Sequence, residues 1–142
     1  MLKFPANLIK KEMIQKIFDK YKDIASISYY ADNGWLSLFE QHLIFLKSIN
    51  IKDISFEVNA KEKFGALRIY TNISFQYNLN EEGSYEYHED MEYLRKIITN
   101  NASELETKSI TICEGCGNPG TLIKQGWWKT LCSSCNEKRF IK

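Results

Sequence analysis

The chain has 142 residues, of which 44% are hydrophobic and 13% aromatic, so it is long enough for one globular domain with a small appendage. Its formal net charge of +1, with lysine far outnumbering arginine, excludes a generally basic nucleic-acid binder. No apolar run reaches the length that crosses a membrane, so no membrane partner is expected.

The N-terminal part is expected to hold two amphipathic helices. Apolar residues recur at helical spacing from Asn7 to about Tyr21, with lysines on the opposite face. A second helix should run to about Ile49 after the turn signal Asp32-Asn33-Gly34, while residues 24–30 between the helices fit either a short strand or an ordered loop. Its core face would carry Trp35, Phe39, Leu43 and Leu46.

Two alternating segments then predict a β-hairpin. Apolar and polar residues alternate from Asp53 to Ala60 and again from Leu67 to Tyr77, and the strands would join near Phe64-Gly65. One face of such a hairpin is apolar and needs a covering layer, which the amphipathic helices can supply. The sequence therefore predicts an α+β body with helices packed on a hairpin or small antiparallel sheet.

The tip of this hairpin is a candidate partner-binding site. Lys61, Lys63 and Arg68 would gather around the turn, with the aromatic Phe64 among them. Such a basic tip can contact phosphate or an acidic protein surface. The competing interpretation is that these side chains are only solvated, as polar residues on an outer face usually are.

A third helix is expected from about Tyr85 to Thr107. Its early carboxylates complement the helix dipole, so His88 with Glu92 is not assigned as a metal pair, and His42 is assigned as a surface or satisfied helix residue rather than a base. The helical pattern ends near Ser109, which predicts a body over residues 1–108 and a metal module over 109–142. The core face of this helix would carry Met91, Leu94, Ile98, Ala102 and Leu105.

Four C-terminal cysteines carry the most specific signal in the chain. Cys113 and Cys116 form one Cys-x-x-Cys pair, and Cys132 and Cys135 form a second after fifteen intervening residues. This spacing is what one tetrahedral zinc ion requires. With a hairpin of Thr121 to Lys124 and Trp127 to Leu131 between the pairs, the pattern predicts a zinc ribbon.

Three alternatives compete with zinc. Two disulfides would need an oxidising compartment, but residues 1–10 lack the apolar run of a signal peptide, so a cytoplasmic protein is expected. A thioredoxin-like redox pair would need a single Cys-x-x-Cys in a βαβ context, which surrounds neither pair. Iron suits the same ligands and stays open.

The expected metal has a structural role, since four thiolates close the shell that a catalytic zinc keeps open for water. A nucleobase deaminase would need His-x-Glu upstream and Pro before the second pair, whereas the chain has His88-Glu89-Asp90 and Leu131. No nucleophile, base and orienting group can be assembled, so no enzyme activity and no small-molecule substrate are expected.

Trp127 and Trp128 are further candidates for partner binding. Alternation in the expected ribbon strand sends their rings to opposite faces, and a unit of about thirty residues can scarcely bury both. We therefore expect one ring to pack against the body and the other to serve as a binding hot spot or a base-stacking platform.

These motifs together resemble a family of small, largely uncharacterised proteins of bacteriophages and prophages. The resemblance covers roughly residues 34–135 and is carried by Gly34-Trp35 at the head of a helix, by a strand motif and by the cysteine motifs. It implies an intracellular, phage-type origin with a cytoplasmic location in a bacterial host cell, zinc ligands at the four cysteines and a role directed at host machinery. The motifs read Lys61-Glu62-Lys63-Phe64-Gly65-Ala66-Leu67-Arg68-Ile69-Tyr70, then Cys113-Glu114-x-Cys116-Gly117-x-Pro119-Gly120, then Gly126-Trp127-x-x-Thr130-Leu131-Cys132.

Two classes of function follow from the sequence. The first is a non-catalytic module that binds and modulates or inhibits a host or defence protein, as the closed metal shell, near-neutral charge and candidate exposed aromatics suggest. The second is a nucleic-acid-binding accessory factor that uses the basic hairpin tip, the tryptophans and the basic tail of Lys138, Arg139 and Lys142.

Overall fold

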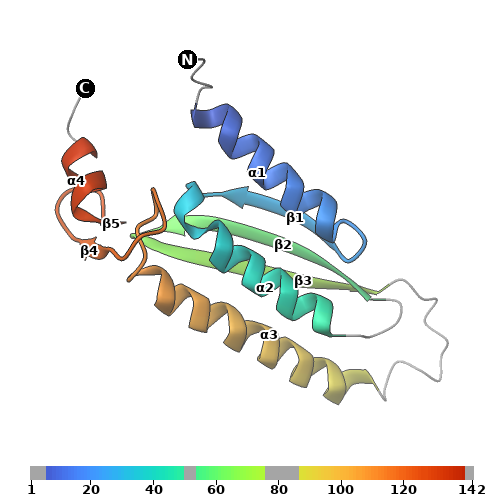
Figure 1. Cartoon of the computed structure of the whole chain (residues 1–142). Coiled ribbons are helices and arrows are strands. Elements are labelled where there is room, and N and C mark those ends of the chain that lie inside the picture. The colour runs from blue at the N-terminus through green and yellow to red at the C-terminus, as the bar shows by residue number, and fades with distance from the viewer. Residues whose placement is uncertain (1–5, 50–53, 76–86, 140–142) are drawn as a thin grey trace.

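The protein is α+β, as predicted: helices pack on a three-stranded sheet, and a small cysteine-bearing unit follows. In this computed structural model, residues 6–49, 54–75 and 87–139 are described, with the side chains of residues 12–49, 54–74 and 91–139. The elements are α1 (Ala6–Tyr21), β1 (Ala25–Tyr30), a short 3-10 helix η1 (Asn33–Trp35), α2 (Leu36–Ser48), β2 (Ile54–Lys63), β3 (Ala66–Phe75), α3 (Tyr87–Ser109), β4 (Thr121–Ile123), β5 (Lys129–Leu131) and α4 (Ser133–Arg139) (Figure 1).

The sheet combines the predicted hairpin with a third strand. β2 pairs with β3 in antiparallel register around the turn at Phe64-Gly65, and β1 pairs with β2 in parallel through the crossover helix α2. The segment before α2, for which the sequence left strand or loop open, is therefore a strand. Both turn residues have positive φ, 53° for Phe64 and 77° for Gly65, which is the pattern of a tight type I′ hairpin turn. The predicted ends at Asp53, Tyr77 and Tyr85 lie outside the described residues.

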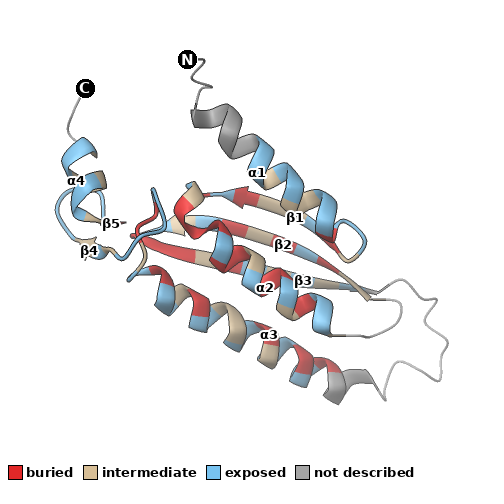
Figure 2. Ribbon diagram, viewed as in Figure 1, coloured by how far each residue is buried: buried red, intermediate tan, exposed pale blue. Residues whose placement is uncertain are grey.

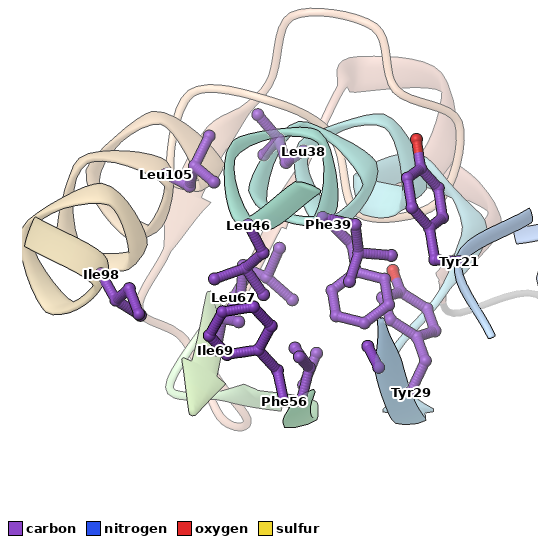
Figure 3. Close-up of a cluster of buried hydrophobic side chains, with 14 of the residues drawn as sticks. Tyr21, Tyr29, Leu38, Phe39, Leu46, Phe56, Leu67, Ile69, Ile98 and Leu105 are labelled. Carbon is purple, nitrogen blue, oxygen red and sulfur yellow. The ribbon is translucent and has the colours of Figure 1, made fainter. Parts of the chain in front are cut away.

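The hydrophobic core lies between one face of the sheet and the helices (Figures 1 and 3). The helical face predicted for α2 and its entry turn is fully buried, and the predicted face of α3 is buried apart from Ala102, which is partly buried. Each fully buried Leu or Phe contributes roughly 1.5–3 kcal/mol, so this layer supplies most of the stability of the body. Its core members include Tyr21, Tyr29, Trp35, Leu38, Phe39, Leu43, Leu46, Phe56, Val58, Leu67, Ile69, Ile98 and Leu105.

The opposite face of the sheet is here called the open face. It carries the polar residues that alternate with core residues along each strand. Apart from Ala66 beside the hairpin turn, which is buried, its residues are exposed or half-buried (Figure 2), and the described helices contribute their buried side chains to the other face. The strand register arranges the open face in rows, with Tyr30, Lys61 and Arg68 in one row and Ser28, Asn59 and Tyr70 in the next.

The cysteine module, defined as β4, β5, α4 and the four cysteines, differs from the expected ribbon in its details. Its two strands are antiparallel but have three residues each, so Trp127 and Trp128 precede β5 instead of lying in it. The prediction that both tryptophans lie in the second ribbon strand was therefore wrong, so strand alternation does not set the directions of their rings. Helix α4, which begins directly after Cys132, was not predicted.

Candidate metal centre

The four cysteines lie together and could hold a metal ion. Their Sγ atoms are all within 4.8 Å of one another, and those of Cys116 and Cys132 are 3.6 Å apart. A tetrahedron of sulfurs at about 2.3 Å from a central ion has edges of about 3.8 Å, whereas a disulfide brings two sulfurs to about 2.05 Å. The spacing therefore fits four thiolates around one ion.

Backbone hydrogen bonds hold each cysteine pair in a tight turn. In the first pair, the Gly117 N–H donates to the Cys113 carbonyl at 2.9 Å, and the Cys113 N–H donates to the Asn118 carbonyl at 2.7 Å. In the second pair, the Asn136 N–H donates to the Cys132 carbonyl at 2.9 Å, where α4 begins. Two compact turns thus bring four thiols from distant parts of the module to one point.

The thiols differ in their tendency to ionise. Burial raises the pKa of Cys113, but hydrogen bonds from the backbone N–H groups of Cys132, Cys116 and Gly115 outweigh it and lower this pKa to about 6. The hydrogen bond with the Cys132 thiol, followed by burial, raises the pKa of Cys135 to about 12. Cys113 therefore ionises more readily than Cys135. A divalent cation would supply the positive charge that ionises the other thiols.

Buried Glu114, between the first two cysteines, ties the first turn to β5. Its Oε1 accepts a hydrogen bond from the Lys129 Nζ at 2.8 Å, and its Oε2 accepts one from the Thr130 N–H at 3.3 Å. The Glu114 N–H in turn donates to the Thr130 carbonyl at 2.9 Å. No local pattern predicts this role, because Glu114 is surrounded by turn residues and its partners lie fifteen and sixteen positions away.

The metal centre docks on the N-terminal end of α2 through Gly34 and Trp35. The Gly34 N–H donates to the Glu114 carbonyl at 2.8 Å, and a Cβ on Gly34 would lie only 2.0 Å from the Cys113 carbonyl oxygen. The buried Trp35 indole Nε1–H reaches the carbonyls of Ser109 at 3.1 Å and Ile112 at 2.8 Å. The Gly-Trp pair thus joins the core of the body to the segment that leads into the cysteines.

The β2–β3 hairpin turn provides a second attachment. The buried Thr130 Oγ1 donates to the Gly65 carbonyl at 2.7 Å, and the Leu67 N–H donates to the Ser109 Oγ at 2.8 Å. These bonds connect residues that are 65 and 42 positions apart in the chain. The hairpin tip and the cysteine module therefore contact each other directly.

A cavity of about 580 Å³, here called the tip groove, opens at this contact. The ring of Trp128 meets that of Phe64 edge-on, with centroids 6.1 Å apart, while Trp127 is 70% exposed. The Arg139 Nη2 donates to the Trp127 carbonyl at 2.6 Å and so helps to position this loop. The groove is lined by Lys63, Phe64, Ala66, Arg68, Gly126, Trp127 and Trp128.

Five of the six candidate partner-binding residues thus line one groove, although they come from two distant motifs. The sixth, Lys61, lies on the open face with its Nζ 5.6 Å from the centre of the Tyr70 ring. Arg68 also pairs with Glu106 of α3, at 3.0 Å between Nε and Oε1, so part of its charge is already compensated. The expectation that one tryptophan packs against the body is confirmed for Trp128.

His42 is a satisfied core residue. It is fully buried on α2, with Nδ1 2.8 Å from the Asn101 Oδ1 and Nε2 2.8 Å from the Thr71 Oγ1. A neutral imidazole that donates from Nδ1 and accepts at Nε2 satisfies both contacts. Burial lowers its pKa, which the hydrogen bond to Asn101 only partly opposes. The side chain of His88 lies outside the described residues.

Sequence reasoning missed Tyr30 and Tyr70 as surface features. Both rings lie on the open face and are exposed, by 75% and 46%. Their positions in the alternating pattern could have indicated this, because each tyrosine alternates with a core residue and so falls on the polar side of its strand.

No family model, curated protein or solved structure matches the chain. Among the helices that the structure describes, none is long and apolar enough to cross a membrane.

Proposed function

We propose that the protein is a non-catalytic zinc-binding protein that acts in the bacterial cytoplasm by binding, and thereby modulating or inhibiting, a host or defence protein. One structural zinc ion bound by Cys113, Cys116, Cys132 and Cys135 would hold the cysteine module against the body. The clustering of the four Sγ atoms within 4.8 Å supports the ion, and their soft thiolate chemistry suits zinc. Metal analysis of the purified protein would distinguish zinc from iron.

The observation that carries this proposal is the tip groove. Two tryptophans, a phenylalanine and an arginine meet there at the surface, and Trp, Tyr and Arg dominate the binding energy of protein interfaces. The exposed Trp127 offers a large apolar area, and Lys63 adds positive charge at the edge of the cavity. Such a groove suits a protein partner that inserts an apolar side chain beside acidic residues.

The bacteriophage origin and the host or defence target rest on the resemblance of the strand and cysteine motifs to phage proteins. Residues of all the motifs meet in the structure. Gly34 and Trp35 contact the cysteine segment, while Gly65 and Leu67 of the strand motif contact Thr130 and Ser109. These contacts support the interpretation that the motifs belong to one shared architecture.

Affinity purification of the zinc-loaded protein from a bacterial lysate, with and without nuclease, tests this function. We expect a discrete protein to be recovered despite nuclease and to be lost with Trp127→Ala. Tyr93→Ala is the matched control, because Tyr93 is an exposed ring on α3, away from the groove. If the intact metal-loaded protein captures nothing, the proposed function is wrong; if both variants capture equally, the groove is not the binding site.

A further inference from the structure

The open face of the sheet carries a pattern that the proposed function does not use. Tyr30 on β1 and Tyr70 on β3 flank the central strand, where Lys61 sits directly beside Tyr30 in the register and opposite Arg68. The neighbouring positions are small and polar: Ser28 and Asn59 pair with each other and with Tyr70 in the next row. Exposed rings thus alternate with cations and hydrogen-bonding groups across the sheet.

Cations lie over rings along a path from the open face to the tip groove. The Lys61 Nζ is 5.6 Å from the Tyr70 centroid, the Lys63 Nζ is 5.9 Å from that of Phe64, and the Lys124 Nζ is 4.9 Å from that of Trp128. Ammonium groups this close to ring faces interact with them favourably. The same surface therefore presents flat rings and positive charge at short intervals.

Positive charge exceeds negative charge on this path, although the whole chain is nearly neutral. Of the nearby carboxylates, Glu62 accepts a hydrogen bond from the Gly65 N–H at 2.9 Å, and Glu106 pairs with Arg68. Glu57 is the exposed carboxylate on the described part of the open face, one row further from the tip than Tyr70. Three lysines, at positions 61, 63 and 124, thus give this end of the sheet and the adjoining module a local excess of positive charge.

We propose that the open face binds single-stranded nucleic acid, with bases stacked on Tyr30 and Tyr70 and phosphates held by Lys61, Lys63 and Arg68. This goes beyond the proposed function, because the ligand class and the stacking residues are different. Sheet faces that carry exposed aromatic residues bind unpaired bases, and basic grooves with interspersed rings follow the backbone of a single strand. A duplex keeps its bases stacked on one another and could use only the cations.

The direct test is fluorescence anisotropy with fluorescein-labelled oligo(dT) and oligo(U) of about 15 nucleotides, bound to the zinc-loaded full chain. We expect binding at about 50 mM salt that weakens steadily towards about 200 mM, because each phosphate contact releases counterions. A duplex of equal length and polyglutamate should compete at least tenfold less well. Comparison of the two probes shows whether single-stranded DNA or RNA is preferred.

Variants separate stacking from charge. Tyr30→Ala with Tyr70→Ala should weaken binding by about fivefold or more for each ring, while the corresponding Phe variants should retain it, because a phenyl ring still stacks. Tyr93→Ala is the matched control for an exposed ring outside this face. Lys61→Gln should reduce the salt slope by about 0.7, and Lys96→Gln, an exposed lysine of α3, should leave it unchanged.

Four outcomes would overturn the proposal: no binding of either single strand at low salt, equal competition by duplex, equal competition by polyglutamate, or wild-type affinity in the double Tyr→Ala variant. Loss of oligonucleotide binding with Trp127→Ala alone, with the tyrosine variants unaffected, would place the ligand in the tip groove instead. Capture of a host protein without oligonucleotide binding would support the proposed function and reject this inference.

Discussion

Phe64 occupies a backbone conformation that rarely suits it. Its φ of 53° lies in the left-handed region, where a residue other than Gly, Asn or Asp costs on the order of 1 kcal/mol. Its ring is nevertheless 61% exposed and has an edge-on contact with Trp128, so burial of the ring offsets little of this strain energy. Strain of this kind often accompanies residues that serve binding. Phe64 is therefore the residue whose substitution best tests the tip groove.

Substitution of this residue separates stability from binding. Asn-Gly is the preferred pair for a type I′ turn, so we expect Phe64→Asn to leave the free energy of unfolding unchanged or to raise it by up to about 1 kcal/mol. The same change should abolish capture of a partner in the tip groove. Urea denaturation and affinity purification measure the two effects. A stability loss above about 1 kcal/mol would show instead that the ring packs for structural reasons.

Gly34 lies where the chain of the metal centre passes close to the body. Because a Cβ there would overlap the Cys113 carbonyl oxygen, Gly34→Ala must displace the cysteine segment from the end of α2. We expect a loss of about 3 kcal/mol in unfolding free energy and weaker metal retention against a chelator. Gly126→Asn is the control, because a Cβ at Gly126 meets nothing within 4 Å and Asn tolerates its φ of 65°. Equal losses of stability and metal retention in both variants would contradict a specific role for Gly34 at the contact between the metal centre and the body.

His42 makes the stability of the body depend on pH. Its folded pKa lies below 6.5, so between pH 6.5 and that folded value the unfolded chain binds more protons than the folded one. Stability attributable to His42 is therefore complete above about pH 6.5 and falls by up to about 1.4 kcal/mol per pH unit below it. Denaturation of wild type and His42→Gln between about pH 7 and pH 5 measures this. If the unfolding free energies of the two proteins fall in parallel with decreasing pH, His42 is not the source of the pH dependence.

At the scale of elements, the periodic segments were predictable and the cysteine module was only partly so. Alternation identified β2 and β3, and helical spacing identified the buried faces of α2 and α3, because these elements bury one regular side. The lengths of β4 and β5 and the presence of α4 follow instead from the cysteine turns and from contacts of Glu114 and Thr130 with distant residues. No local periodicity encodes such contacts.

The same reason explains what was missed at the candidate site. The four cysteines were predictable from their spacing alone, but the meeting of Phe64 with Trp128 depends on bonds such as that from Thr130 to Gly65. Placing the tryptophans before β5, in a bend, allows both to line the groove. The alternating pattern could have placed the two tyrosines on the polar side of their strands. Only the pairing of the third strand, β1, with β2 brings Tyr30 beside Lys61.

Metal removal should affect the cysteine module before the body. Structural zinc contributes roughly 10–16 kcal/mol in small peptides, whereas the body has its own core between the sheet and helices. After chelation we expect the Trp127 and Trp128 proton signals to shift towards unfolded values while far-UV circular dichroism retains most of its helical signal. Added zinc should restore the spectra. Unchanged tryptophan signals after complete metal removal would contradict a structural role for the ion.

At the scale of the whole molecule, the two proposed surfaces depend differently on the contact between its halves. The tip groove takes Phe64 and Arg68 from the hairpin and Trp127 and Trp128 from the cysteine module, so it exists only while the two are joined. Tyr30 and Tyr70 lie entirely on strands of the body. A change that loosens the module should therefore disable the groove far more than the open face.

Thr130→Val tests this dependence without touching a metal ligand. It removes the buried hydrogen bond from the Thr130 Oγ1 to the Gly65 carbonyl and leaves that carbonyl unpaired, at a cost of about 1–3 kcal/mol. We expect the variant to retain zinc, to lose most of its capacity to capture a protein partner, and to bind single-stranded oligonucleotide within about threefold of wild type, because the stacking rings share no bond with Thr130 and stay in place. Thr121→Val, an exposed threonine of β4, is the matched control. Equal loss of both activities in Thr130→Val would mean that one surface, formed jointly by the hairpin tip and the module, serves both ligands.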